Sequence, residues 1–268
     1  MVVSEIDKPA SQLIKARINK PNLGNLKIID WANVEPIDII TAGYPCQPFS
    51  HAGNRKGADD ERHLWPYIKT AISILRPRFV VLENVRGHFG LGFGDVISDL
   101  ANIGYNARWT LVRASDVGAP HRRERLFIVA YPKSGGDGQC SKISAKVLEY
   151  RNGVVEHSHT DSFGRALVGN TSGKVRNKRQ SQFKFDQLGK EIYNQAVPPA
   201  LDQGKLNVKF VEYMMGLPDG WVTDLEISRA QMLKILGNGV VPQQAYYALQ
   251  QLLTSVDNMP QNIIVTLS

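Results

Sequence analysis

The sequence reads Gly43-Tyr44-Pro45-Cys46-Gln47-Pro48-Phe49-Ser50 at the point where its fold and its chemistry are most clearly marked. Residues 37–42 come directly before this stretch and form an apolar, β-branched run that predicts a buried strand. Cys46 is therefore expected on a turn at the carboxyl end of a strand, where open α/β sheets bind their ligands. Pro45 and Pro48 restrict the backbone on both sides of the thiol. A lone cysteine is more often buried and inert, so the rest of the chain must decide its role.

Strand and helix patterns alternate along the chain. Strands are expected at residues 2–5, 26–29, 37–42, 78–85, 108–112 and 125–131. Helices are expected at residues 9–17, 64–75, 95–103, 208–215 and 242–253. This rhythm predicts an α/β fold with a doubly wound, mainly parallel sheet.

Composition sets limits on the class of protein. The chain has 268 residues, of which 43% are hydrophobic and 21% charged, as is ordinary for a globular protein. No apolar run approaches the roughly 20 residues that span a bilayer, so no membrane association is expected. Cysteine occurs twice, which favours a reducing setting, and we expect a cytoplasmic protein of a bacterial or phage-infected cell.

The positive charge is concentrated in one segment. The formal net charge is +7, and residues 133–205 hold twelve Lys or Arg against seven Asp or Glu. The segment is also rich in Gly, Ser, Asn and Gln and has weak periodicity. By itself it fits either a disordered linker or an insert that binds nucleic acid.

Four further segments point, together with the Cys46 stretch, to a known family. They are Glu83-Asn84-Val85, Pro120-His121-Arg122-Arg123-Glu124-Arg125, Met215-Gly216-Leu217-Pro218-Asp219-Gly220-Trp221 and Gly237-Asn238-Gly239-Val240-Val241-Pro242. In this order they closely resemble the motifs of the cytosine-C5 DNA methyltransferases of bacterial or phage type. The resemblance runs from residue 2 to about residue 253. It implies a class I methyltransferase fold, Rossmann-like, with a small target-recognition insert.

The resemblance also implies a division of the chain. Residues 1–131 would form the catalytic and cofactor domain, and residues 132–206 the target-recognition region that reads DNA. Residues 207–256 would form helices that return to the catalytic domain, and residues 257–268 a tail. Under this division the basic segment favours DNA binding over a linker.

Cytosine C5 is a poor nucleophile, so a thiolate must first add to C6, which makes Cys46 the expected catalytic nucleophile. Glu83 would supply a proton or strong hydrogen bond at N3, provided that burial raises its pKa. Arg123 and Arg125 match the family's supporting cations. The activated C5 would take the methyl group of S-adenosylmethionine after the base is flipped out of the duplex. No metal is expected.

Further residues match the family at its binding positions. Cofactor-binding residues would be Glu5, Asn25, Pro45, Leu64, Asn238 and Val240, with Glu5 on the ribose hydroxyls. Asn25 replaces the usual Asp of a Gly-Asp-Ile motif, so weaker binding is expected there. DNA-binding residues would be Ser50, Lys174, Arg176, Lys178 and Arg179.

The start of the chain departs from the family, which opens with a strand and a Gly-rich cofactor turn. By this resemblance the chain would begin inside the second strand, and the first, central strand would be expected to be absent. Three explanations compete: a start placed too late, a degenerate relic, or a piece supplied by a separate polypeptide. A fourth is that residues 263–267 fill the vacant strand position, although they would not supply the turn.

The sequence thus predicts S-adenosylmethionine-dependent methylation of cytosine C5 in duplex DNA. The alternatives are a catalytically inactive relic that binds DNA, and a tRNA cytosine-C5 methyltransferase. Expected partners are double-stranded DNA and, as a candidate, a cognate restriction endonuclease, and we expect a monomer.

Overall fold

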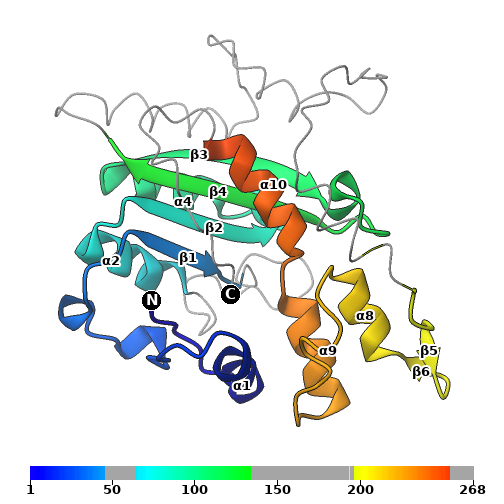
Figure 1. The fold of residues 1–268 in the computed structure, drawn as a ribbon. Helices are drawn as coiled ribbons and strands as arrows, with labels where there is room; N and C mark the ends of the chain where they lie inside the picture. The colour runs from blue at the N-terminus through cyan, green and yellow to red at the C-terminus, as the bar shows by residue number, and fades with distance from the viewer. Residues whose placement is uncertain (46–63, 134–192, 194–195, 254–268) are drawn as a thin grey trace, which may run out of the picture.

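The computed structural model describes residues 1–45, 64–133, 193 and 196–253 of the chain. Its centre is a four-stranded sheet, shown in Figure 1. The strands are β1 (Ile39–Gly43), β2 (Phe79–Val85), β3 (Tyr105–Arg113) and β4 (Glu124–Pro132), in the spatial order β1-β2-β4-β3. β1 and β2 run parallel, whereas β4 runs antiparallel to both β2 and β3.

Helices surround this sheet. They are α1 (Lys8–Arg17), α2 (Trp65–Leu75), α3 (Gly87–Gly90), α4 (Phe93–Asn102), α8 (Val208–Met214), α9 (Arg229–Asn238) and α10 (Pro242–Leu253). Short 3₁₀ turns occur at Leu26–Ile28, Trp31–Asn33 and Ala114–Val117. A small separate hairpin pairs β5 (Leu201–Asp202) with β6 (Lys205–Leu206).

Each face of the sheet buries its own apolar cluster. Even-numbered residues of β2 and β4, such as Val80 and Ile128, belong to the cluster that contains α2 and α4. Odd-numbered residues, such as Phe79 and Val129, pack with α10. In Figure 1, α10 crosses in front of the sheet and α4 lies behind it. The result is a three-layer α/β/α arrangement, which explains why β2 and β4 are apolar on both faces.

The expected α/β fold of class I methyltransferase type is confirmed, with a sheet that contains a parallel pair. In the described part of the chain one strand pairing is parallel and two are antiparallel. The reason is the short connection through residues 114–123, which carries the chain from β3 directly back into β4. Such a link can join only antiparallel neighbours, since a parallel pair needs a long crossover.

Two expected strands near the start of the chain are not formed. Residues 26–29 were expected to be extended, but Leu26–Ile28 form a 3₁₀ turn because the Asn25 side chain accepts a hydrogen bond from the Lys27 amide. Residues 2–5 contribute only an isolated bridge between Val3 and Asn22 among the described residues. The expected helix at 9–17 is present as α1, capped by Asp7, whose carboxylate accepts from the Ala10 amide.

Candidate active site

Glu83 and Arg125 meet at the carboxyl end of β2. In the register of the two antiparallel strands, Arg125 lies opposite Val85, and Glu83 lies two residues back on the same face. Arg125 Nε donates to Glu83 Oε1 at 2.8 Å, and both side chains are largely shielded from solvent. This bond joins two residues that the sequence predicted as catalytic, from segments 42 residues apart in number.

The Glu83 carboxyl sits in a partly desolvated position. Burial raises its pKa, while the charges of Arg125 and Arg123 oppose that rise. Gly43 of β1 lies opposite Glu83 in the parallel register. A Cβ on Gly43 would come within 3.1 Å of Glu83 Oε2, so the glycine makes room for the carboxylate. A carboxyl with a raised pKa, next to a fixed cation, is suited to donate a proton or strong hydrogen bond.

Arg123 is placed by different contacts. Its Nη2 donates to the carbonyl oxygens of Gly237 (2.8 Å) and Gly239 (2.6 Å), at the end of α9. Burial, followed by the neighbouring Arg125, lowers the pKa of Arg123 to about 10, while Glu83 raises it. Arg123 therefore stays charged at neutral pH and ties the start of β4 to the Gly237-Asn238-Gly239 segment.

The carboxyl end of β1 is fixed by β2 and α3. Asn84 points to the face opposite Glu83 and donates its Nδ2 to the carbonyl oxygen of Tyr44 at 3.0 Å. The Tyr44 hydroxyl is 2.9 Å from Nε2 of His88, and the two rings are perpendicular. Trp65 of α2 packs against Tyr44 at 5.7 Å between ring centroids. These residues hold the backbone directly before Pro45 and Cys46.

The expected cofactor residues lie in three parts of the fold: before β1, between β1 and α2, and at the junction of α9 and α10. Glu5 is held by Asn22, whose Oδ1 accepts from the amides of Glu5 and Gly24, and Asn25 follows Gly24 in the sequence. Glu5 Oε1 accepts from the Asp7 amide at 2.7 Å, so one carboxylate oxygen takes part in a local turn. Leu64 is the residue directly before α2 and is half-buried against the main cluster.

The remaining members of the set are Pro45, exposed after β1, Asn238, exposed at the end of α9, and Val240, packed beside the α10 cluster. Six other predicted residues lie outside the described part of the chain: Cys46, Ser50, Lys174, Arg176, Lys178 and Arg179.

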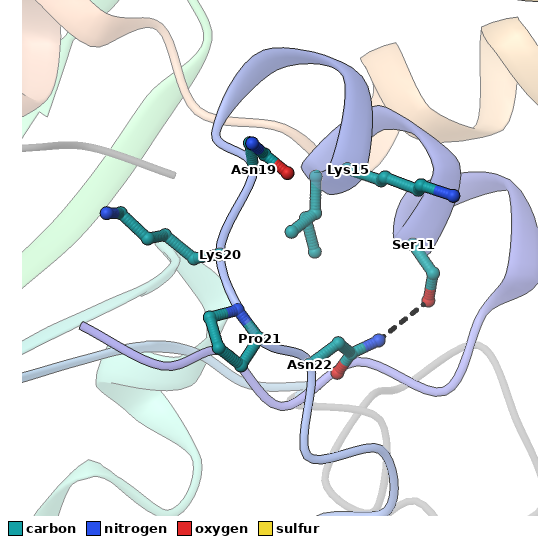
Figure 2. Close-up of a pocket in the computed structure, with 7 residues that line it drawn as sticks. Ser11, Lys15, Asn19, Lys20, Pro21 and Asn22 are labelled. Carbon is teal, nitrogen blue, oxygen red and sulfur yellow. Dashed lines mark hydrogen bonds between the residues drawn. The ribbon is translucent and has the colours of Figure 1, made fainter.

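A surface hollow of about 520 Å³ lies beside α1. Figure 2 shows its lining, including the hydrogen bond from Asn22 to Ser11. The lining residues are Ser11, Ile14, Lys15, Asn19, Lys20, Pro21 and Asn22. None of these was predicted to belong to a functional site, but two of them, Asn22 and Ser11, bond to the backbone of the predicted cofactor residue Glu5.

Glu212 is a structurally important residue that the sequence did not single out. It is 1% exposed, and its carboxylate accepts from the amides of Gly220, Val222 and Thr223 and from the Thr223 hydroxyl. Arg17 of α1 donates to the carbonyls of Gly220 and Trp221 in the same loop. A glutamate three residues before the motif that starts at Met215 is a weak signal, because exposed helical glutamates are far commoner.

Gln243 and Gln244 hydrogen-bond to segments that are distant in the sequence. Gln243 Nε2 donates to the Gly216 carbonyl, and Gln244 Nε2 donates to the carbonyls of Val112 and Arg123. Gly216 has φ +65°, and a Cβ there would clash with Gln243, so this position requires glycine. The segments that carried the resemblance are thus bonded to one another around the start of β4.

The chain is similar to several known methyltransferases. The family model for C-5 cytosine-specific DNA methylase matches residues 1–151. The chain is 36% identical to the Type II methyltransferase M.NlaX of Neisseria lactamica, over 88% of the chain and 83% of that protein. It is 24% identical to the Type II methyltransferase M.DsaV of Dactylococcopsis salina, over 95% and 79% of the two chains.

Among solved structures, the fold is similar to that of the Entamoeba histolytica methyltransferase EhMeth, with a TM-score of 0.56 and 15% identity. That alignment covers 94% of this chain and 90% of the other. None of the helices in the described residues is long and apolar enough to cross a membrane. On the family match and the 36% identity to M.NlaX, the chain belongs to the family of C-5 cytosine-specific DNA methylases.

Proposed function

We propose that this protein transfers a methyl group from S-adenosylmethionine to C5 of a flipped-out cytosine in duplex DNA. The observation that carries the proposal is the Glu83–Arg125 pair at the carboxyl end of β2, next to the segment that leads to Cys46. Glu83 has a raised pKa caused by burial, as a proton donor at N3 requires. Membership of the family supplies the reaction class.

The reaction would proceed by covalent catalysis. The Cys46 thiolate forms a bond from Sγ to C6, and Glu83 gives its proton to N3 as negative charge builds there. The C4–C5 electron pair of the resulting enamine would then form the bond from C5 to the methyl carbon, while the bond from that carbon to the donor sulfur breaks and S-adenosylhomocysteine leaves. A base would remove the C5 proton, the electron pair of that bond would form the C5–C6 double bond, the thiolate would leave C6, and N3 would return its proton to Glu83. Arg125 would hold the Glu83 carboxyl and the ring edge in position, and Arg123 would keep the Gly237–Gly239 segment against the site.

S-adenosylmethionine supplies the electrophilic methyl group when it is bound. Glu5 fits one part of this cofactor, because a half-exposed carboxylate can accept from two ribose hydroxyls. Asn25, Pro45, Leu64, Asn238 and Val240 would line the remainder of the pocket. Asn25 already accepts from the Lys27 amide, so its amide group is held in a fixed orientation.

DNA would be bound by Ser50 and by the basic set Lys174, Arg176, Lys178 and Arg179, within a target-recognition region at residues 132–206. Lysine and arginine in such a region neutralise phosphates and give salt-dependent affinity. The relatives' Type II designation makes a cognate restriction endonuclease the partner to test for.

Methyl transfer from labelled S-adenosylmethionine to duplex DNA, with tRNA as the competing substrate, tests the proposal. Wild type should label duplex DNA, and Cys46→Ala should abolish labelling while DNA binding survives. Glu83→Gln should reduce the rate by at least about 100-fold, since it removes the proton donor but keeps the shape. Labelling of tRNA alone, or DNA binding without transfer by the wild type, would contradict the proposal.

A further inference from the structure

A polar contact outside the proposed catalytic set fixes the chain just before Cys46. Tyr44 is 7% exposed and His88 is 3% exposed, and the Tyr44 hydroxyl lies 2.9 Å from His88 Nε2. A buried tyrosine hydroxyl and imidazole can hydrogen-bond only if each faces the other in a defined orientation. The contact therefore determines where the Tyr44 side chain sits.

The same tyrosine is held at its backbone. Asn84 Nδ2 donates to the Tyr44 carbonyl at 3.0 Å, and Asn84 is buried. Asn84 directly follows Glu83 on β2, and His88 follows on α3. The segment that carries the Glu83 carboxylate thus hydrogen-bonds to Tyr44 at two points, the carbonyl oxygen and the hydroxyl.

Tyr44 lies between the two residues to which the proposed reaction assigns the chemistry, Glu83 in space and Cys46 in sequence. Gly43, its neighbour before, lies opposite Glu83 and close to the Glu83 carboxylate. Cys46 follows two residues later in the sequence. A shift of Tyr44 would change the approach of β1 to Glu83 and the point from which Cys46 extends, and misplacement by about 1 Å is enough to cost on the order of 100-fold in rate.

We propose that His88 is a positioning residue for the methyl-transfer site, acting through Tyr44 to hold the end of β1, from which the chain continues to Cys46, next to Glu83. Burial lowers the pKa of His88 to about 4, so the imidazole is neutral and keeps the same hydrogen bond at the pH of catalysis. This role rests on the proposed function of Cys46 and Glu83.

The test uses Tyr44→Phe, which removes only the hydroxyl, His88→Phe, which keeps a ring, and the double variant. Tyr105→Phe is the matched control: Tyr105 is also buried and donates its hydroxyl to Pro77 at 2.7 Å, but it lies at the opposite end of the sheet. The primary readout is the rate at which iodoacetamide alkylates Cys46, followed by mass spectrometry across pH. Cys140, the other cysteine in the chain, is the reference in the same sample.

Tyr44→Phe and His88→Phe should each change the alkylation rate of Cys46 by at least about fivefold, toward the rate of free cysteine. The double variant should show no larger change than either single variant. The Cys140 rate and the Tyr105→Phe variant should stay at wild-type values. In methyl transfer, both single variants should lower kcat with little change in KM for DNA.

An unchanged Cys46 rate, or an equal change at Cys140 or in Tyr105→Phe, would show a purely structural contact and overturn the inference. Additive effects of the two variants would show that His88 does not act through Tyr44. A wild type without methyl transfer would contradict the proposed function alone, because the alkylation rates do not depend on turnover.

Discussion

Residues 1–43 and residues 64–132 form two differently built regions of the molecule. No residue of the first region is buried, and β1, which closes it, alternates between exposed and half-buried positions. The second region supplies most of the apolar cluster around α2, α4, β2 and β4. The difference shows that the Glu83 side of the site is held by close packing, whereas the Glu5 side is held mainly by polar contacts.

Polar contacts across the molecule attach the first region. Arg17 bonds to the loop at Gly220 and Trp221, and Lys234 of α9 bonds to Asp7. Such contacts are individually worth far less than a buried apolar side chain. We therefore expect local opening of residues 1–38, which precede β1, at a lower free energy than unfolding of the sheet.

The largest expected difference comes from truncating the same residue type in each region. Leu82→Ala, at a fully buried position of β2, should cost about 3 kcal/mol of unfolding free energy. Leu23→Ala, at a position that is 37% exposed, should cost less than about 1 kcal/mol. Urea denaturation of both variants measures the two losses of unfolding free energy. Equal costs would mean that the first region is as well packed as the second.

Acid should weaken the second region through His88. The folded pKa of about 4 is below the ordinary value of 6.5, chiefly through burial, with Asp95 acting in the opposite direction. The unfolded chain therefore binds more protons between these pH values, and stability falls as pH drops from 6.5 to 4 by up to about 3 kcal/mol. The His88→Phe variant should lose correspondingly less unfolding free energy over this pH range. Parallel curves of unfolding free energy against pH for the variant and the wild type would refute the role of His88.

A smaller effect is expected from releasing α1. Arg17→Met removes the charged donor to the two loop carbonyls but keeps an apolar stem, and should cost about 1 to 2 kcal/mol. Hydrogen exchange should quicken in α1 and leave β2 and β4 protected. Faster exchange throughout the sheet would show that the two regions unfold as one unit.

The smallest effect is expected from the exposed ion pair. Lys234→Met leaves Asp7 able to cap α1, so it isolates the pair from the cap. The Lys234 hydrogen bond lowers the pKa of Asp7, yet the lysine is largely exposed, and we expect a loss of about 0.5 kcal/mol or less. Thermal denaturation at low and high salt checks this, and a loss that salt does not reduce would count against an ion-pair origin.

Sequence patterns located the elements of the packed region closely. The strand predicted at residues 78–85 and the helix predicted at 64–75 match β2 and α2 to within one residue, because Pro77 and the left-handed Arg76 mark a sharp boundary between them. α9 was not predicted, since only Leu236 of its residues is buried. Its signal was the Ser228 and Gln231 capping box, which is visible in the sequence.

The sequence identified residues of the candidate site, but it did not predict the contacts between them. Glu83 and Arg125 were each expected at strand ends, but the antiparallel register that joins them could not be read from a pattern typical of parallel sheets. His88 and Glu212 were missed because their importance comes from burial and from partners distant in sequence. Cys46, on which the chemistry depends, stays a prediction outside the described residues.

Trapping of the covalent intermediate tests the central claim most directly. Fluorine at C5 cannot leave as a proton does, so duplex DNA with 5-fluorocytosine should stop the reaction after methyl transfer with the thiol still bound to C6. With S-adenosylmethionine present, mass spectrometry should find the DNA adduct on Cys46, with no adduct in Cys46→Ala. An adduct on Cys140, or methylation of ordinary duplex DNA by Cys46→Ala, would contradict the account.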